Sequence, residues 1–219
     1  MVAYPPIEGE RSTQLFFFFC SIVMKRLFLF LSILLTLVSE GKYFSTVIID
    51  PGHGGRDKGA YWGGVRESYL NLIVSHKLSY ELKRRGIRVV MVRKRDRFLS
   101  KHYRVRLANR YPSAVFVSVH FNASLYTRAK GIETFYYSSE GRKLASKVQS
   151  RMVRQLKGRN RGVKRGNYQV LRESRPTAIL VECGFISNAR ERARCLTRWY
   201  QTSAASAIAR GLMDYRKMR

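Results

Sequence analysis

The sequence predicts an α/β domain whose sheet is mostly parallel and carries helices on both faces. From residue 42 onward, short apolar segments rich in β-branched side chains alternate with longer amphipathic segments, which is typical of βαβ units. The chain has 219 residues, of which 45% are hydrophobic and 26% charged, so it is long enough to bury one sizeable core. No internal repeat and no long linker divides it. We therefore expect residues 42–219 to form a single domain.

The first half of this domain is expected to contain three buried strands and two helices. Each strand is a nearly continuous apolar run, as expected where both faces of a sheet are covered. The three strands are predicted at residues 44–50, 87–93 and 114–120. Residues 68–86 favour a helix, because apolar side chains recur at helical spacing between a candidate N-cap, Ser68, and a terminating glycine, Gly86. Residues 104–111 favour a shorter helix.

The second half is expected to contain three more strands and the closing helices. The strands are predicted at residues 131–137, 168–172 and 177–183. Residues 140–158 favour a basic amphipathic helix. The segment KGRNRGVKRG, residues 157–166, is interpreted as a basic turn, and residues 189–217 as one or two closing helices.

The charge of the chain is unusual, with a net value of +28 at pH 7. Residues 1–41 hold equal numbers of basic and acidic side chains, so the whole surplus belongs to the folded part. Such a surface attracts polyanions such as nucleic acid, anionic lipid or an acidic wall polymer. A basic nucleic-acid-binding protein is therefore one hypothesis, although the sequence contains no dedicated nucleic-acid module. General solubilising charge is another interpretation.

The first 41 residues are predicted to be an N-terminal extension followed by a secretory signal peptide. Residues 24–41 have a basic start at Lys25 and Arg26, a short apolar run and small residues at the end. We expect translation to begin at Met24 and the product to be exported to the periplasm or cell envelope. The alternative is an uncleaved anchor over residues 15–38, but its two central basic residues argue against it.

The three cysteines, Cys20, Cys183 and Cys195, do not form a disulfide framework or a thiol zinc motif. Cys183 directly follows Glu182, so strand alternation should place the two side chains on opposite faces. We expect Cys183 to be a buried packing residue.

Four polar residues stand where functional groups gather in an open α/β sheet, at or near the carboxyl ends of strands. His53 follows the first strand, while His120 and Glu182 close two others. Glu67 lies in a glycine-rich loop before the long helix. Two imidazoles and one carboxylate suit a catalytic zinc ion with an open position, and the second carboxylate could then transfer protons. His76 and His102 lack such a position and are interpreted as ordinary helix and loop residues.

Four motifs resemble those of the zinc-dependent N-acetylmuramoyl-L-alanine amidases with a type-3 catalytic domain. The motifs are DPGHGG, VRESYLNL, FVSVHFNA and LVECGFISN, in that order. The resemblance runs from about Thr46 to Tyr215 and implies a six-stranded sheet. It also implies hydrolysis of the amide that joins N-acetylmuramic acid to the L-alanine of a peptidoglycan stem peptide, in wall remodelling or daughter-cell separation.

The resemblance also assigns roles to the four polar residues. By motif position, His53, Glu67 and His120 match the family's zinc ligands, for one Zn²⁺ per chain, and Glu182 matches its catalytic glutamate. Asp50 and Asn122 lie beside ligands and are predicted to hydrogen-bond the distal imidazole nitrogens, since ligating histidines need such partners. The alternative is that Asp50 shapes a turn and Asn122 caps a chain end.

Some relatives carry an inserted helix that blocks the zinc until a partner protein removes it. This chain shows no such insertion between residues 137 and 168, so we expect a site that is open without an activator. It also shows no separate wall-binding domain, and its positive charge is expected to provide contact with anionic wall polymer or lipid.

Three other functions remain as alternatives. A carboxypeptidase or endopeptidase of the cell wall, acting within the stem peptide, would use the same residues. A non-catalytic wall binder is disfavoured because all four site residues are present, and the nucleic-acid binder is the third.

Overall fold

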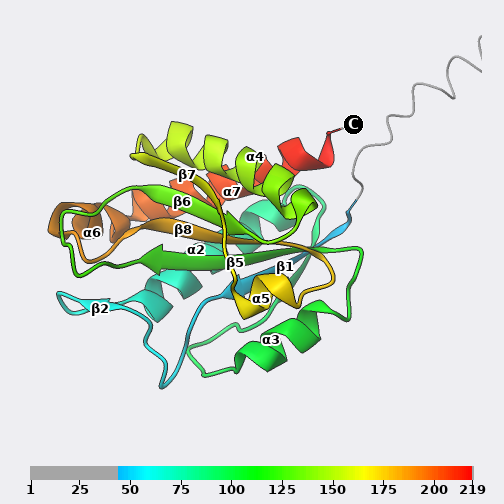
Figure 1. Ribbon diagram of the computed structural model, residues 1–219, viewed down its shortest axis with the longest axis horizontal. Coiled ribbons are helices and arrows are strands. Elements are labelled where there is room, and N and C mark those ends of the chain that lie inside the picture. Colours follow the sequence, from blue (N-terminus) through cyan, green and yellow to red (C-terminus); the bar gives the residue numbers. More distant parts are fainter. Residues whose placement is uncertain (1–43, 219) are drawn as a thin grey trace, which may run out of the picture. The chain divides into compact units, whose positions relative to one another are not determined.

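The computed structural model describes residues 44–218, which form a six-stranded sheet with helices on both faces (Figure 1). The strands are β1 (Thr46–Pro51), β4 (Arg88–Met91), β5 (Val115–Asn122), β6 (Ile132–Tyr136), β7 (Asn160–Arg165) and β8 (Thr177–Phe185). Their order is β4-β1-β5-β8-β6-β7. The first four are mutually parallel, β6 is antiparallel to β8, and β7 is parallel to β6. The predicted fold class is confirmed.

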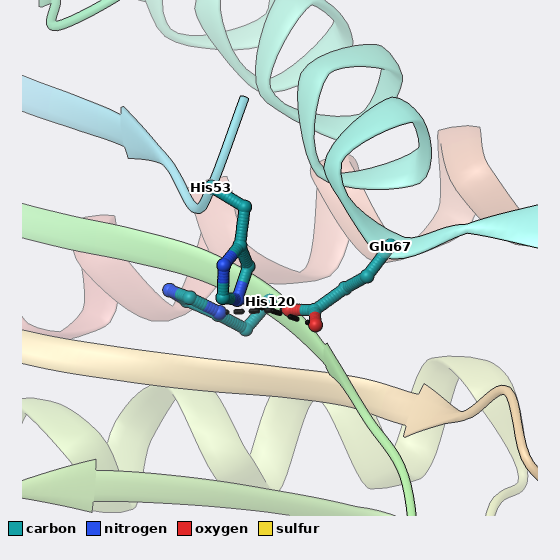
Figure 2. A group of neighbouring side chains, drawn as sticks. All are labelled: His53, Glu67 and His120. Carbon is teal, nitrogen blue, oxygen red and sulfur yellow. Dashed lines mark hydrogen bonds and ion pairs between the residues drawn. The ribbon is translucent and has the colours of Figure 1, made fainter. Parts of the chain in front are cut away.

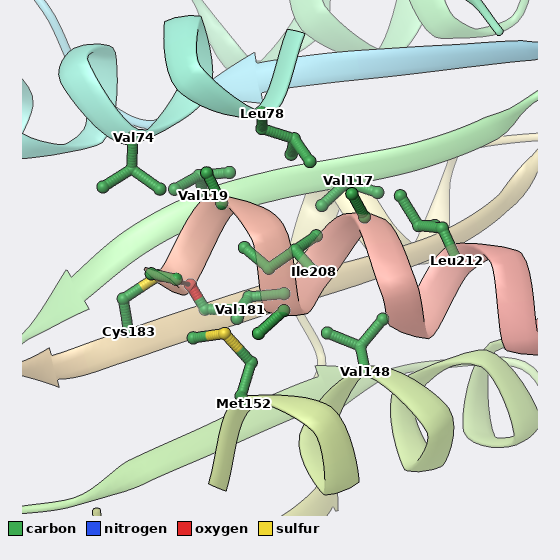
Figure 3. Close-up of a cluster of buried hydrophobic side chains, with 14 of the residues drawn as sticks. Val74, Leu78, Val117, Val119, Val148, Met152, Val181, Cys183, Ile208 and Leu212 are labelled. Carbon is green, nitrogen blue, oxygen red and sulfur yellow. Dashed lines mark hydrogen bonds between the residues drawn. The ribbon is translucent and has the colours of Figure 1, made fainter. Parts of the chain in front are cut away.

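The two faces of the sheet are covered to different extents. The helices are α2 (Glu67–Lys83), α3 (Lys101–Ala108), α4 (Ser139–Leu156), α5 (Gln169–Arg172), α6 (Ala189–Cys195) and α7 (Arg198–Arg216). The larger core lies under α2, α4 and α7, where Val117 and Val181 of the sheet meet Ile208 of α7 (Figure 3). The smaller core lies on the other face, where α3 and α5 cover Phe116 and Leu180.

One predicted strand was wrong. Residues 168–172 were expected to be a strand, but Gln169–Arg172 form the short helix α5. Its two apolar side chains, Val170 and Leu171, are buried in the smaller core rather than alternating across a sheet. The sixth strand is instead β7, which lies in the segment interpreted as a basic turn. It is an edge strand, and such strands carry charged side chains that prevent further pairing, so no apolar pattern marks it.

The glycine-rich loop before α2 is a β-hairpin of strands β2 (Tyr61–Trp62) and β3 (Val65–Arg66). Its turn residues Gly63 and Gly64 have φ values of 53° and 78°, which suit the two-residue turns of tight hairpins. The hairpin is followed directly by α2, so it positions Glu67, the first residue of that helix.

The predicted extension and signal peptide lie outside the described residues. Among residues 44–218, no helix is long and apolar enough to cross a membrane.

Candidate metal centre and active site

The structure brings His53, Glu67 and His120 together at the carboxyl end of the sheet (Figure 2). One donor atom from each lies within 4.8 Å of the others. The carboxylate of Glu67 is 2.8 Å from Nδ1 of His120 and 3.3 Å from Nε2 of His53. Two imidazole nitrogens and one carboxylate oxygen, converging from separate elements, form a donor set that fits Zn²⁺. Glu67 and His120 are more than fifty positions apart in the chain, and the fold brings them together.

The backbone around His53 explains why glycines surround this residue. His53 adopts a φ of 59°, in the left-handed region, which costs a non-glycine residue about 1 kcal/mol or more. Gly54 and Gly55 also have positive φ values, 132° and 60°. This sharp turn after β1 directs the imidazole back toward the sheet. Strain of this kind is typical of functional sites.

Two other glycines allow the ligand side chains to approach the backbone closely. A Cβ atom at Gly52 would lie 2.2 Å from Cε1 of His120. A Cβ atom at Gly59 would lie 2.5 Å from Oε2 of Glu67. Any larger residue at either position would therefore displace a ligand side chain.

The distal nitrogens of both imidazoles have protein partners. Nδ1 of His53 lies 2.9 Å from each carboxylate oxygen of Asp57. Nε2 of His120 lies 3.1 Å from Oγ of Ser118, which donates a hydrogen bond of 2.8 Å to Asp50. These contacts hold each ring with its other nitrogen toward the cluster, as ligating histidines require.

The partners of the imidazoles differ from those predicted. Asp50 acts on His120 only through Ser118, and Asn122 donates to Glu133 at 2.6 Å instead of contacting an imidazole. Asn122 points along the sheet because the side chain of Glu133 lies within its reach on β6. Asp57 was missed because it sits in a loop, away from any strand end.

Glu182 lies beside this cluster, on the strand next to His120. His120 and Glu182 are directly paired between β5 and β8, and Glu133 on β6 is paired with Glu182 from the other side. Oε2 of Glu182 is buried and has no hydrogen-bond partner among the described residues. Burial, together with the nearby charges of Glu67 and Glu133, raises the pKa of Glu182 well above its usual value. A buried carboxyl oxygen without a partner, next to a candidate metal site, is available to a reacting group.

Sequence comparison decides the family. The sequence profile described as N-acetylmuramoyl-L-alanine amidase matches residues 47–214. This chain belongs to the N-acetylmuramoyl-L-alanine amidase family. Residues of the four motifs named above, which are far apart in the sequence, meet at one edge of the sheet in the fold.

The chain is similar to two proteins of Bacillus subtilis. It is 40% identical over 180 residues to the uncharacterized protein YqiI of Bacillus subtilis, covering 80% of this chain and 85% of YqiI. It is 33% identical to the N-acetylmuramoyl-L-alanine amidase LytC of the same organism, covering 78% of this chain but only 35% of LytC. The shared region is thus one part of LytC and most of YqiI.

Solved structures agree with this assignment. An N-acetylmuramoyl-L-alanine amidase from Clostridium difficile 630 is 41% identical with a TM-score of 0.75, covering 78% of this chain and 95% of that one. The catalytic domain of CwlV, an N-acetylmuramoyl-L-alanine amidase from Bacillus (Paenibacillus) polymyxa var. colistinus, is 34% identical with a TM-score of 0.76, covering 78% and 98%.

Two buried arginines of the amidase fix the loop that carries His53. Arg104 of α3 pairs with Asp50 and donates to the carbonyl oxygens of Pro51 and His53, both at 2.8 Å. Arg93 donates to the carbonyl oxygens of Pro51 and Gly52, both at 2.9 Å. Burial and the neighbouring charge of Arg104 lower the pKa of Arg93 to about 10. Sequence reasoning missed both roles, because arginines in so basic a chain are expected at the surface.

Two of the three candidate ligands, Glu67 and His53, have shifted pKa values. Burial raises the pKa of Glu67, but its contacts with both imidazoles outweigh burial and the net shift is downward. For His53, burial lowers the pKa, but the contacts with Glu67 and Asp57 outweigh it and the net shift is upward. A bound cation would therefore compete with a proton on the imidazole of His53.

The remaining histidines and Cys183 lie outside the metal cluster. His76 contacts the carbonyl oxygen of Lys94 at 3.0 Å, and His102 contacts the side chain of Gln169 at 3.1 Å. Cys183 is fully buried in the larger core, where burial raises the pKa of its thiol well above the usual value. It is a packing residue, as predicted.

We expect Gly52→Ala to weaken metal binding without unfolding the chain. The backbone at Gly52 does not need a positive φ, but the new methyl group would push the ring of His120 away from the cluster. A ligand misplaced in this way typically lowers metal affinity about 10–100-fold, as the loss of an orienting contact does. Zinc titration against a chromogenic chelator measures the change. Gly86→Ala is the control for the loss of a glycine, since nothing lies within 4 Å of a Cβ there; its φ of 71° strains the alanine and so lowers stability, but it leaves the metal cluster untouched. Equal zinc affinity in both variants would contradict the steric argument.

Proposed function

We propose that this amidase hydrolyses the bond between N-acetylmuramic acid and L-alanine in peptidoglycan, with one Zn²⁺ held by His53, Glu67 and His120. The observation that supports this most strongly is the position of Glu182, a half-buried side chain with one buried, unpartnered carboxyl oxygen, on the strand next to the proposed metal ligand His120. An amide needs both a strong nucleophile and a protonated leaving nitrogen. A metal site and a proton-transferring acid, side by side, provide both.

Each residue of the site has a defined task in this reaction. When bound, zinc supplies Lewis-acid chemistry that polarises a carbonyl and makes water a stronger acid. Glu182 accepts a proton from the attacking water and delivers it to the nitrogen of alanine as the C–N bond breaks. Burial and the charges of Glu67 and Glu133 raise the pKa of Glu182, which makes it a stronger base toward that proton than an ordinary carboxylate. The products are the muramoyl carboxylate and a peptide with a free amino group.

Asp57 and Ser118 are proposed to hold the two imidazoles in their ligating orientation. Their contacts with the distal nitrogens, 2.9 Å and 3.1 Å long, favour the tautomers in which the other nitrogen faces the cluster. Asp50 assists Ser118, and Asn122 holds Glu133 beside Glu182.

The decisive experiment is product analysis of digested muropeptides by mass spectrometry, with and without a chelator. The proposal expects an intact stem peptide released from the sugar, and no release when zinc is removed. A carboxypeptidase or endopeptidase would instead shorten the stem peptide while leaving it attached. DNA binding that weakens steeply with salt, without any hydrolysis, would support the nucleic-acid alternative.

We further propose that the enzyme is exported and acts in the cell envelope without an activating partner. Between β6 and β8, the described chain contains only α4, β7 and α5, with no further helix inserted. The surplus positive charge supports a weak contact with anionic wall polymer or lipid. Purified zinc-loaded protein should hydrolyse muropeptides unaided; activity that appears only after a second protein is added would contradict this.

We expect zinc to stabilise the fold more strongly as the pH rises. In the metal-free protein the pKa of His53 is raised, so its ion pairs stabilise the fold below the unfolded pKa and are lost as pH rises through the folded pKa. Zinc binding shows the opposite trend, because it displaces protons and strengthens by up to about tenfold per pH unit for each proton released. Thermal unfolding with and without zinc, between about pH 6 and about pH 8, measures the difference. A zinc-induced shift in Tm that stays constant over this range would contradict imidazole ligation.

A further inference from the structure

An open groove of about 960 Å³ lies at the carboxyl edge of the sheet, outside the metal cluster. One wall is the tip of the β2–β3 hairpin with Trp62, the second is the loop after β5 with Arg128, and the third is the segment after β8 with Arg190. In Figure 1 the hairpin and α6 lie on either side of the ends of β5 and β8. Each wall is continuous in the chain with an element that carries a site residue. The hairpin leads into α2, which begins with Glu67; the other two walls follow β5, which carries His120, and β8, which carries Glu182.

The groove is strongly basic. It is lined by Arg128, Lys130, Arg190, Arg192 and Arg194. None of these five forms a salt bridge with any described residue. The one acidic lining residue, Glu191, is buried and accepts hydrogen bonds from the backbone N–H groups of Gly131 and Phe185. Glu191 also interacts electrostatically with Arg194 and Lys130, so one carboxylate offsets part of the positive charge of the groove and most of it remains.

The groove is also held in shape. Arg192 donates to the carbonyl oxygen of Ile186 at 2.7 Å, and its guanidinium lies against Gly63 at the hairpin turn, where an added Cβ would be 2.6 Å away. Asn188 donates to the carbonyl oxygen of Thr127 at 2.9 Å and so links two walls. Arg128 and Arg190, in contrast, are exposed and have no such contact in the described chain, which leaves their guanidinium groups available to a ligand.

We infer that this groove binds carboxylates on the peptide side of the substrate. The inference rests on the proposed function, and it follows from where the substrate carries charge. The carboxyl group on the sugar side is consumed in the scissile amide, so N-acetylated sugars next to that bond are uncharged. The peptide retains at least its terminal carboxylate, and guanidinium groups recognise carboxylates well. The peptide thus extends from the metal cluster over the sheet edge into the groove, while the sugar faces the other side.

A second basic groove provides a matched control. It is lined, among others, by Arg106 on α3, Arg110 just after α3 and Arg175 just before β8. This places it near the amino end of β8, away from the ligand cluster. Charge lost there changes the overall electrostatic attraction equally but removes no contact with the peptide.

The test compares Arg128→Gln/Arg190→Gln with Arg106→Gln/Arg110→Gln. Two muropeptide substrates are used, one with free stem carboxylates and one in which they are chemically amidated. We expect the wild type to prefer the free form through a lower KM, and the groove variant to lose about tenfold of that preference. The control variant should keep it. In parallel, calorimetry measures how a synthetic stem peptide with a free terminal carboxylate binds the zinc-loaded protein; this peptide lacks the muramoyl amide, so no turnover is involved.

Each outcome is informative. Equal loss of preference in both variants would overturn the inference, because general attraction would then explain it. Peptide binding that is unchanged in the groove variant would also overturn it, as would a groove that binds inorganic polyphosphate but not the peptide. Absence of turnover on either substrate would count against the proposed function, yet weaker peptide binding by the groove variant alone would still support the groove assignment.

Discussion

Replacing Glu182 by glutamine is expected to lower turnover about 10³-fold while zinc stays bound, because general acid–base catalysis contributes about 10²–10⁴-fold. Glutamine has nearly the same shape but can neither accept a proton from water nor donate one to the departing alanine nitrogen. His53, Glu67 and His120 are untouched, so zinc content should remain one per chain. The measurements are kcat on a muropeptide and metal analysis of the purified variant.

The same substitution should not destabilise the fold. Burial and the charges of Glu67 and Glu133 raise the pKa of Glu182, so the folded state binds the proton more tightly than the unfolded state. Stability is then lost as pH rises from the unfolded pKa through the folded one. Glutamine removes this penalty, so the Tm of the variant should match or exceed that of the wild type, increasingly so at higher pH. An activity loss that comes with a lower Tm would indicate misfolding instead.

Glu133→Gln is the matched control for Glu182→Gln. Glu133 lies directly opposite Glu182 on β6, but its carboxylate is occupied by Arg161 at 3.1 Å and by Lys164 at 2.5 Å. It cannot exchange a proton with substrate while held in this way, so its loss should affect turnover far less. If the two variants lost turnover equally, the negative charge on this face of the sheet would be what matters, rather than proton transfer by Glu182.

The sequence predicted the central strands well because a strand that is buried on both faces is a continuous apolar run. β1, β5 and β8 are continuous apolar runs, and each is covered on one face by α2, α4 or α7 and on the other by α3 or α5. The edge strand β7 has no such apolar run, since its residues are exposed or half-buried and include the charged side chains of Arg161 and Lys164. Residues 168–172 were misjudged because Val170 and Leu171 favour strands locally, whereas a tertiary contact with α3 decides their conformation.

The site was predictable where strand ends determine it. His120 and Glu182 are paired between adjacent strands, so their proximity follows from the order of the sheet. The supporting residues depend on three-dimensional contacts that no spacing encodes. Asp57 reaches His53 only because of the left-handed turn, and Arg104 reaches the same loop from a helix about fifty residues further on.

Replacing His120 by alanine is expected to abolish stoichiometric zinc binding and to reduce turnover about 10⁴-fold or more, since both the Lewis acid and the activated water are lost. The imidazole of His120 supplies one of three donors, and the remaining pair, His53 and Glu67, would hold a cation weakly. Metal analysis after dialysis, together with muropeptide turnover, measures both effects. Wild-type protein stripped by a chelator should be equally inactive, but added zinc should restore only the wild type.

His76→Ala is the matched control, because His76 is a histidine of the same domain that contacts a backbone carbonyl instead of the cluster. It should retain one zinc per chain and full turnover, so that the loss in His120→Ala cannot be attributed to removing any imidazole. One equivalent of zinc in the His120→Ala protein would place the metal elsewhere. Since Glu182 could not then transfer a proton to a substrate activated at this edge of the sheet, that single result would also remove the physical basis for its catalytic role.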